Sequence, residues 1–439
     1  MAVLIAGGFM ASTCAWGQAN YATPYTFVTI AGTAGNNSSA NGLNGAGLFE
    51  FPEGMVVDTN DNLYVVDSGA STVVKVSPAG GTNWMVTRIA GNPDNPGSHD
   101  GNNQSATFSE PAGIAIDSSN NLYVADTGNS ILRKMTQSGP NWAVTTIAGT
   151  PEVFGSADGT NGAAQFEAPA GIAVDASGNL YVADTDNQTI RMVVPMGTNW
   201  VVTTIAGTVG SQGATDGTNL TAQFFNPSAI VVDHAGNLFV ADSGNNTIRE
   251  MVPVGTNWVV STIAGSTIGS GNADGTNTSA QFNFPAGLAV DANDNLYVAD
   301  TFNNSIRKIT PVGTNWVTTT LAGAADNSHG TNNGTGTNAF FYNPYGVTAD
   351  VAGKLFVGDT INDTIRQGTV AAVPNPAISL TAGGSVMVSW PGPGGTLQTN
   401  ADLSTANWGV YGGTVSSSGG TNSVTLPPTG GSLYFRLTN

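Results

Sequence analysis

The sequence predicts an all-β protein: a six-bladed β-propeller of four-stranded blades, followed by a small C-terminal β-domain. A phrase of the type GIAVD…NLYVAD returns six times, each copy carries two runs of alternating apolar residues, and the N-terminus resembles a strand that the last copy lacks. The second aspartate of the phrase recurs at steps of 59, 58, 58, 58 and 59 residues, at Asp67, Asp126, Asp184, Asp242, Asp300 and Asp359. Such a fixed period indicates one structural unit copied in tandem.

Each repeat has the pattern of a four-stranded antiparallel meander. In the third copy, residues 171–175 and 179–184 alternate small and branched apolar residues, as two strands joined by a short turn do. Residues 189–193 and 200–206 predict the third and fourth strands. The third residue of the first turn needs a left-handed backbone, and every copy has Gly, Asn or Asp there: Asp61, Asn120, Gly178, Gly236, Asp294 and Gly353.

We expect the N-terminus to supply the fourth strand of the last repeat. Five copies open this strand with a tryptophan, at Trp84, Trp142, Trp200, Trp258 and Trp316, and no such segment follows Arg366. Residues 25–32 match the missing strand, with Tyr25 in the place of the tryptophan. A ring closed in this way has no free sheet edges, which disfavours an open solenoid with terminal caps.

The repeats resemble a known family. Six in-phase copies of GIAVD, NLYVAD and a following D-x-x-N-x-x-I-R are similar to the NHL repeats of six-bladed β-propellers, over residues 25–370. The units here are longer than the usual repeats of that family. The additional residues lie between strand four and the next strand one, as in residues 150–168.

A phenylalanine and a proline recur where each long loop returns to the sheet. We expect the phenylalanines to pack between blades and the prolines to fix the entry into strand one. The phenylalanines are Phe49, Phe108, Phe166, Phe224, Phe282 and Phe340, and the prolines are Pro52, Pro111, Pro169, Pro227, Pro285 and Pro344.

The two ends of the chain differ from the repeats. Residues 1–19 resemble a secretory signal peptide and contain the only cysteine, Cys14, so we expect an exported protein without disulfides, secreted or in the periplasm and cell envelope. The propeller should occupy residues 21–372, a linker 373–376 and a small β-sandwich-like domain 377–439. The C-terminal motifs VSWP, TLQ, NW and YFRL resemble short modules of exported proteins from Verrucomicrobia-like bacteria.

Composition restricts the partners. The formal net charge is -18, which argues against nucleic acid and anionic lipid surfaces. No stretch after the signal peptide is long and apolar enough to span a membrane. We expect a monomer.

Two sets of aspartates are candidate functional residues. The turn aspartates named above precede an Asn by three positions in five copies, and a second set lies in the long loops: Asp100, Asp158, Asp216 and Asp274. Both sets should share one strongly acidic rim, where oxygen ligands suit Ca²⁺ or a cationic partner. The structural alternative is that each turn aspartate accepts backbone N–H bonds and pairs with the Arg seven residues later.

The sequence does not favour catalysis. The predicted channel-lining strands, GMVVD, GIAID, GIAVD, AIVVD, GLAVD and GVTAD, offer no acid, base or nucleophile before the terminal Asp. His99 and His329 lie in inter-blade loops and are weak ligand candidates, whereas His234 belongs to a turn on the opposite face, which disfavours a three-histidine zinc site. No catalytic residue is assigned, and no cofactor beyond Ca²⁺ is suggested.

The leading hypothesis is therefore a secreted, non-enzymatic binding scaffold whose acidic, loop-rich face takes a protein, glycan or cation. The alternative is a metal-dependent lactonase or lyase on the same fold.

Overall fold

The computed structural model divides the chain into two compact units, Ala22–Val370 and a second formed by Met1–Tyr21 with Ala371–Asn439. In the first unit the structure describes residues 24–324 and 326–370. In the second it describes 4–5, 371, 377–380, 386–391, 396–400, 409–410, 416–418, 421–426 and 434–438. Apart from residues 4 and 5, the predicted signal peptide lies outside the described residues, as does the predicted linker.

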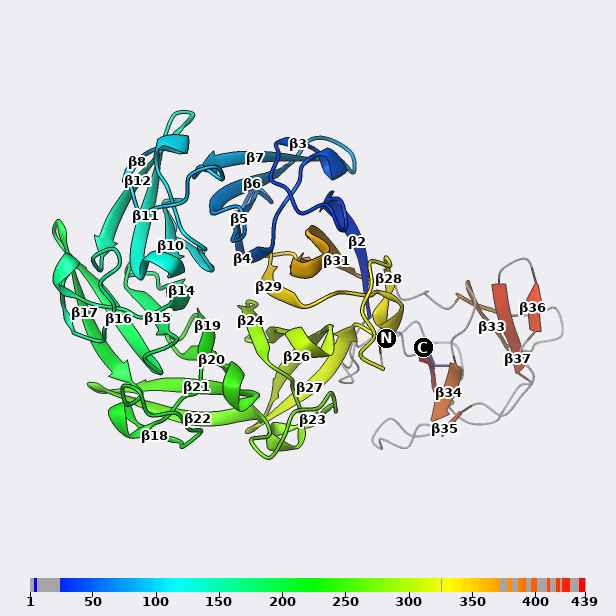
Figure 1. Ribbon diagram of the computed structural model, residues 1–439. Coiled ribbons are helices and arrows are strands. Elements are labelled where there is room, and N and C mark those ends of the chain that lie inside the picture. The colour runs from blue at the N-terminus through cyan, green and yellow to red at the C-terminus, as the bar shows by residue number, and fades with distance from the viewer. Residues whose placement is uncertain are drawn as a thin grey trace. The chain divides into compact units, whose positions relative to one another are not determined.

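The first unit is a six-bladed β-propeller (Figure 1), which confirms the predicted fold class. Each blade is an antiparallel meander that runs from the central channel to the outside. The innermost strands are β4 (Pro52–Val57), β9 (Gly113–Ile116), β14 (Pro169–Val174), β19 (Pro227–Val232), β24 (Pro285–Val290) and β29 (Pro344–Ala349). The second strands are β5 (Leu63–Asp67), β10 (Leu122–Asp126), β15 (Leu180–Asp184), β20 (Leu238–Asp242), β25 (Leu296–Asp300) and β30 (Leu355–Asp359).

The outer strands are longer. The third strands are β6 (Thr72–Pro78), β11 (Ile131–Ser138), β16 (Thr189–Met196), β21 (Thr247–Val254), β26 (Ser305–Val312) and β31 (Thr364–Val370). The fourth strands are β7 (Trp84–Ala90), β12 (Asn141–Ala148), β17 (Asn199–Ala206), β22 (Asn257–Gly265), β27 (Asn315–Ala322) and β2 (Tyr25–Gly32). We number the blades one to six in the order of their innermost strands.

The long loop that enters each blade adds a fifth strand of two residues outside strand four. These strands are β3 (Gly42–Leu43), β8 (Gly101–Asn102), β13 (Gly159–Thr160), β18 (Gly217–Thr218), β23 (Gly275–Thr276) and β28 (Gly334–Thr335). A 3-10 helix follows each: η1 (Asn44–Ala46), η2 (Asn103–Ser105), η4 (Asn161–Ala163), η5 (Asn219–Thr221), η7 (Asn277–Ser279) and η9 (Gly336–Asn338). The four-stranded meander was predicted, whereas this added edge strand was not.

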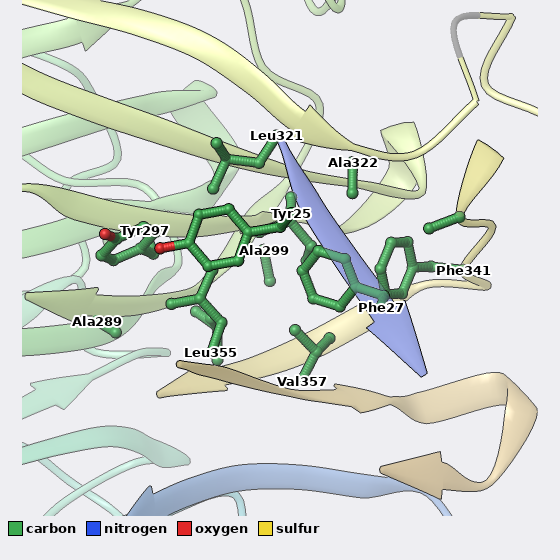
Figure 2. Close-up of a cluster of buried hydrophobic side chains, with 13 residues drawn as sticks. Tyr25, Phe27, Ala289, Tyr297, Ala299, Leu321, Ala322, Phe341, Leu355 and Val357 are labelled. Atoms are coloured by element: carbon green, nitrogen blue, oxygen red, sulfur yellow. The ribbon is translucent and has the colours of Figure 1, made fainter. Parts of the chain in front are cut away.

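The ring is closed by the N-terminal strand, as predicted. β2 pairs antiparallel with β31 of blade six, with Tyr25 opposite Val370 and Thr29 opposite Arg366. Tyr25 and Phe27 are both buried in the cluster between blades five and six (Figure 2). The Phe27 and Phe341 rings meet edge to face with their centroids 5.2 Å apart.

An aromatic contact crosses every blade interface. The second-strand aromatic of one blade meets the fourth-strand aromatic of the next in an edge-to-face contact, a geometry that adds to the energy of burial. The pairs are Tyr64–Trp142, Tyr123–Trp200, Tyr181–Trp258, Phe239–Trp316, Tyr297–Tyr25 and Phe356–Trp84. Tyr25 therefore takes the tryptophan's place in packing as well as in sequence.

One expected core residue was misplaced by one position. Five of the six predicted loop phenylalanines are fully buried, but in blade six the buried residue is Phe341 and Phe340 is partly exposed. Phe341 stands three residues before Pro344, which is the spacing of Phe49 to Pro52 and of the other copies. In blades two to six this phenylalanine also packs against the guanidinium of the buried strand-three arginine. In blade two, the Cζ atom of Arg133 lies 5.1 Å from the centroid of the Phe108 ring.

The second unit contains two antiparallel four-stranded sheets. One orders β32 (Ala377–Leu380), β33 (Val386–Pro391), β37 (Thr421–Leu426) and β36 (Ser416–Ser418). The other orders β1 (Leu4–Ile5), β38 (Tyr434–Thr438), β34 (Thr396–Asn400) and β35 (Gly409–Val410). Val388 and Val424 are opposite each other and buried. Throughout the described parts of both units, no helix is long and apolar enough to cross a bilayer.

Candidate binding face around the channel mouth

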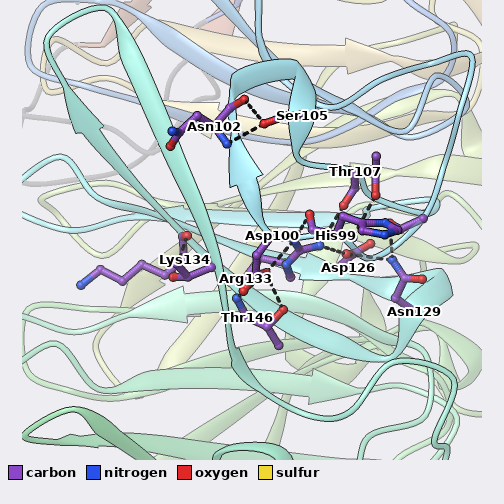
Figure 3. A network of polar contacts seen from close by, with 12 residues as sticks. His99, Asp100, Asn102, Ser105, Thr107, Asp126, Asn129, Arg133, Lys134 and Thr146 are labelled. Atoms are coloured by element: carbon purple, nitrogen blue, oxygen red, sulfur yellow. Dashed lines mark hydrogen bonds and ion pairs between the residues drawn. The ribbon is translucent and has the colours of Figure 1, made fainter.

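A buried ion-pair network links strands two and three of blades two to six. In blade two, Arg133 donates from Nη1 to Oδ2 of Asp126 at 2.7 Å, and both side chains are fully buried (Figure 3). Asn129 donates to the same Oδ2 atom at 2.9 Å. Blades three to six repeat the pair with Arg191, Arg249, Arg307 and Arg366. These contacts favour the structural interpretation of the turn aspartates.

The same arginines also hold the loop aspartates. Nη2 of Arg133 donates to Oδ1 of Asp100 at 3.1 Å, and the backbone N–H and hydroxyl of Thr146 donate to that oxygen. Asp158, Asp216 and Asp274 likewise accept from the arginine and from a threonine hydroxyl of their blades, and each of these loop side chains is about half exposed. In blade six, Asn333 occupies this position. The loop aspartates thus lie beside the outer strands of their own blades, paired with arginine, so the rim is less acidic than we expected.

Burial and pairing oppose each other at the turn aspartates. Burial raises the pKa of Asp126 to about 6, although Arg133 and hydrogen bonds from Ser109 and Asn129 lower it. The carboxylate therefore stays ionised at neutral pH.

Blade one lacks this compensation. Val74 and Ala70 replace the arginine and the asparagine, so Oδ2 of Asp67 is buried without a hydrogen-bond partner. Burial raises the pKa of Asp67 to about 8, which keeps its carboxyl mostly protonated at neutral pH. The irregular first blade noted in the sequence is thus the blade without the ion pair.

The two residues before the recurrent proline are held by different side chains, and the other oxygen of the turn aspartate holds the first of them. Oδ1 accepts from the backbone N–H of the first residue, at 2.6 to 2.8 Å in all six blades. The backbone N–H of the second residue donates to a side chain from the preceding blade, as Phe284 does to Asn246. The second residue has a φ of 45° to 56° in every blade, although none is glycine. The left-handed conformation recurs with Phe, Glu, Ala and Asn side chains, so it is set by the hydrogen bonds of the repeat and not by the residue type.

The side chains of this dipeptide differ from blade to blade. They are Glu50–Phe51, Ser109–Glu110, Glu167–Ala168, Phe225–Asn226, Asn283–Phe284 and Tyr342–Asn343. The dipeptides, the inter-blade loops and the turns between strands two and three lie on one end of the ring, which we call the loop face. Backbone hydrogen bonds join dipeptide and turn, for example from Phe302 to the carbonyl of Asn283 and from Ile361 to that of Tyr342. A constant backbone with variable side chains is an arrangement suited to recognition.

The channel mouth breaks the symmetry as well. The residue after the recurrent proline is Ala112, Ala170, Ser228 or Ala286 in four blades, but Glu53 in blade one and Tyr345 in blade six. Burial raises the pKa of Glu53 to about 8, Glu110 raises it further, and a hydrogen bond with Ser68 lowers it. Burial, and then the charge of Glu53, raise the pKa of Tyr345 above its usual range. The channel forms a cavity of about 360 Å³, lined by the innermost strands with Tyr345 and Ser228 among its residues.

Comparison with known proteins decides the family. The family described as the teneurin NHL domain matches residues 35–249 and 215–310. The chain belongs to the NHL-repeat propeller family. It is 29% identical over 347 residues to the human protein named NHL repeat-containing protein 2, an alignment that covers 72% of this chain and 46% of the relative. Human teneurin-4 is 29% identical over 230 residues, which is 46% of this chain and 8% of the relative.

The chain thus spans less than half the length of these curated relatives. Solved structures share the fold. A Bacteroides thetaiotaomicron protein of unknown function superimposes with a TM-score of 0.60 at 19% identity, over 79% of this chain and 76% of that one. A Bacteroides ovatus protein described as an auxiliary nutrient binding protein gives 0.58 at 17% identity, with the same coverage.

The three histidines of this NHL propeller, which the sequence suggested as ligand candidates or excluded from a zinc site, lie in different blades. His99 is an exposed residue of the loop entering blade two, and its carbonyl accepts from Arg133. His329 is exposed in the loop entering blade six and stacks on Tyr342, with 4.0 Å between centroids. His234 lies in the turn between β19 and β20. Among the described residues, no three His, Cys, Asp or Glu side chains group as metal ligands.

Sequence reasoning missed the dipeptides, Glu53 and Tyr345. The predicted channel-lining strands begin at a glycine in five copies and at Ala229 in the fourth, one residue after the position that Glu53 and Tyr345 occupy. A signal was present: the three positions flanking each recurrent proline vary among six copies whose neighbours agree. The aspartates were predicted as candidates because they recur, whereas the dipeptides, Glu53 and Tyr345 differ from blade to blade.

Proposed function

We propose that this NHL-repeat propeller is an exported binding protein that recognises its ligand with the loop face. The observation that carries the proposal is the constant dipeptide backbone with six different pairs of side chains around one channel mouth. In every blade the turn aspartate accepts a hydrogen bond from the dipeptide backbone, which holds that backbone in one conformation, so the segment loses little conformational freedom when a ligand binds. The fold neighbour described as an auxiliary nutrient binding protein supports a binding role. Export, as a secreted or envelope protein, is supported by the predicted signal peptide.

The test compares the two faces of the ring. Phe302 and Tyr342 on the loop face are changed together to Ser, and Val351, which is 94% exposed in a turn on the opposite face, is changed to Ser as a matched control. Wild type and both variants are immobilised and exposed to envelope extracts and to a panel of soluble polysaccharides. We expect the control to retain the ligands of the wild type and the loop-face variant to lose them. Equal capture by all three proteins would refute the proposal.

A further inference from the structure

Aromatic side chains gather on one part of the loop face. Blades five, six and one contribute Phe284, Phe302, His329, Tyr342 and Phe51, which we call the aromatic arc. The corresponding dipeptides of blades two and three carry no aromatic residue: Ser109–Glu110 and Glu167–Ala168. The dipeptide of blade four carries one aromatic residue, Phe225, and Glu50 places a carboxylate beside Phe51, so aromatic residues are concentrated in blades five, six and one but not confined to them.

Two stacked pairs give the arc flat, rigid rings. The Phe284 and Phe302 rings lie 19° from parallel with their centroids 4.8 Å apart, and Phe302 is 50% exposed. In the next blade, the exposed His329 ring stacks on Tyr342 at 22°. In each pair an exposed ring is supported by a more buried one. A ring held in place by its neighbour loses little freedom when a ligand packs on it.

Hydrogen bonds between blades fix the spacing of the arc. Asn304, in the turn of blade five, accepts from the backbone N–H of Asn343 and donates to the carbonyl of Asn327, two residues before His329. Asp363, in the turn of blade six, accepts from the backbone N–H of Phe51. The arc therefore behaves as one surface across three blades. Amide side chains lie next to two of its rings in the sequence: Asn283 precedes Phe284, and Asn343 follows Tyr342.

Charge excludes an anionic ligand for this surface. In the described propeller, the five repeat arginines are buried, and Lys75, Arg88, Lys134 and Lys308 lie within strands. Lys354 belongs to a turn between strands one and two, on the opposite face. No Lys or Arg in these residues belongs to a loop-face segment, so a phosphate, sulfate or uronate would find no cation to pair with.

The channel mouth beside the arc is polar but weakly charged. Tyr345 of blade six lines the channel cavity, and Glu53 occupies the same repeat position in blade one, close enough for its charge to act on Tyr345. Burial raises the pKa of the Glu53 carboxyl to about 8, so at neutral pH it is mostly a neutral donor and acceptor. Rings, amides, a phenol and a neutral carboxyl match a ligand with apolar faces and hydroxyl groups.

We propose that the aromatic arc binds a neutral oligosaccharide. Sugar rings pack their C–H faces on Phe302 and on the His329–Tyr342 pair, which buries apolar surface, and their hydroxyls bond the neighbouring amides and the mouth groups. This inference rests on the proposed function and adds the class of ligand.

The test is affinity electrophoresis of the full chain in gels that contain xylan, soluble β-glucan or polygalacturonate. We expect at least one neutral polysaccharide to retard the protein and the anionic polygalacturonate to have no effect. Phe302→Ala and Tyr342→Ala should each weaken binding about tenfold or more, and Phe302→Tyr should restore it. Val351→Ala is the control, because Val351 is 94% exposed in a turn on the face opposite the arc. Circular dichroism and melting curves establish that each variant is folded.

Salt gives a second readout. Binding to a neutral sugar should persist at about 1 M salt, where the Debye length is about 3 Å. Retardation by polygalacturonate alone, unchanged binding by both arc variants, or the absence of binding to any neutral polysaccharide would each overturn the inference. If neutral sugars fail while the loop-face variant still loses a protein captured by the wild type, the ligand class is wrong and the proposed function stands.

Discussion

At the scale of single residues, the turn aspartate contacts both the interior of its blade and the variable dipeptide of the loop face. Oδ2 of Asp184 accepts from Arg191 inside the blade, while Oδ1 accepts from the backbone N–H of Glu167 in the dipeptide. The most regular residue of the repeat therefore positions the most variable ones. A substitution at this aspartate should affect both the free energy of unfolding and the shape of the loop face.

Asp184→Asn should be strongly destabilising. The change removes the buried carboxylate partner of Arg191 and leaves the arginine paired only with the half-exposed Asp158, and breaking a buried pair in this way costs about 3–5 kcal/mol. Urea unfolding followed by tryptophan fluorescence measures the loss. Asp158→Asn is the matched control, because Asp158 pairs with the same arginine but its side chain is 49% exposed, so we expect about 1 kcal/mol or less. Equal losses in the two variants would contradict the assignment.

Asp67→Asn should change the pH dependence of stability. The folded-state pKa of Asp67 is raised to about 8 by burial, so the folded protein binds this proton more tightly than the unfolded chain. Its contribution is fully present below about pH 4 and is lost as the pH rises toward 8, by at most about 1.4 kcal/mol per pH unit. Unfolding free energies at several pH values should fall less steeply for the variant. A variant with the slope of the wild type would show that Asp67 is ionised in the fold.

At the scale of elements, the N-terminal strand matters more than its length suggests. β2 provides the fourth strand of blade six and inserts Tyr25 and Phe27 into the cluster between blades five and six. A chain that begins at residue 33 should therefore melt well below one that begins at Pro24, which keeps β2. Tyr25→Ala and Phe27→Ala in the full chain should each cost about 3–5 kcal/mol. Equal melting temperatures for the two truncations would disprove closure by β2.

The elements also show what the sequence could and could not predict. The meander and the closing strand were predictable because long strands impose an alternating pattern and because Tyr25 aligns with Trp84 and its copies. The two-residue edge strands were not predictable, because a segment such as Gly101–Asn102 is too short to show an alternating apolar pattern. They are held by side chains, as Asn103 accepts from the backbone N–H of Trp142. The aromatic arc was not predictable because its parts lie far apart in the chain and meet only in the closed ring.

At the scale of the whole molecule, six similar units produce an asymmetric surface. The aromatic contacts between neighbouring blades recur around the whole ring, and the buried ion pair recurs in five blades. Departures gather where blades five, six and one meet: the arc, Glu53, Tyr345 and the missing arginine of blade one. The blades next to the closing N-terminal strand, five, six and one, are therefore also the blades that differ most from the repeat.

Closure by a swapped strand should make the ring unfold as one unit. β2 belongs to blade six by pairing and continues along the chain into blade one, so the interface between those blades cannot open while β2 stays paired. In a permuted chain, residues 24–32 are moved behind Val370 through a turn copied from residues 196–199. Blade six would then be complete, but only side-chain packing such as Trp84 on Phe356 would join it to blade one.

The permuted chain should fold with an unchanged far-UV circular dichroism spectrum and a lower stability. The loss is on the order of 4 kcal/mol, the scale of closing a long loop, and the unfolding transition should broaden as blades separate individually. Calorimetry measures both effects. A chain that carries the same added turn after Val370 but keeps β2 at its N-terminus is the control. If the permuted chain and the control unfold at one midpoint with equal sharpness, packing alone closes the ring and the swapped strand adds nothing to its cooperativity.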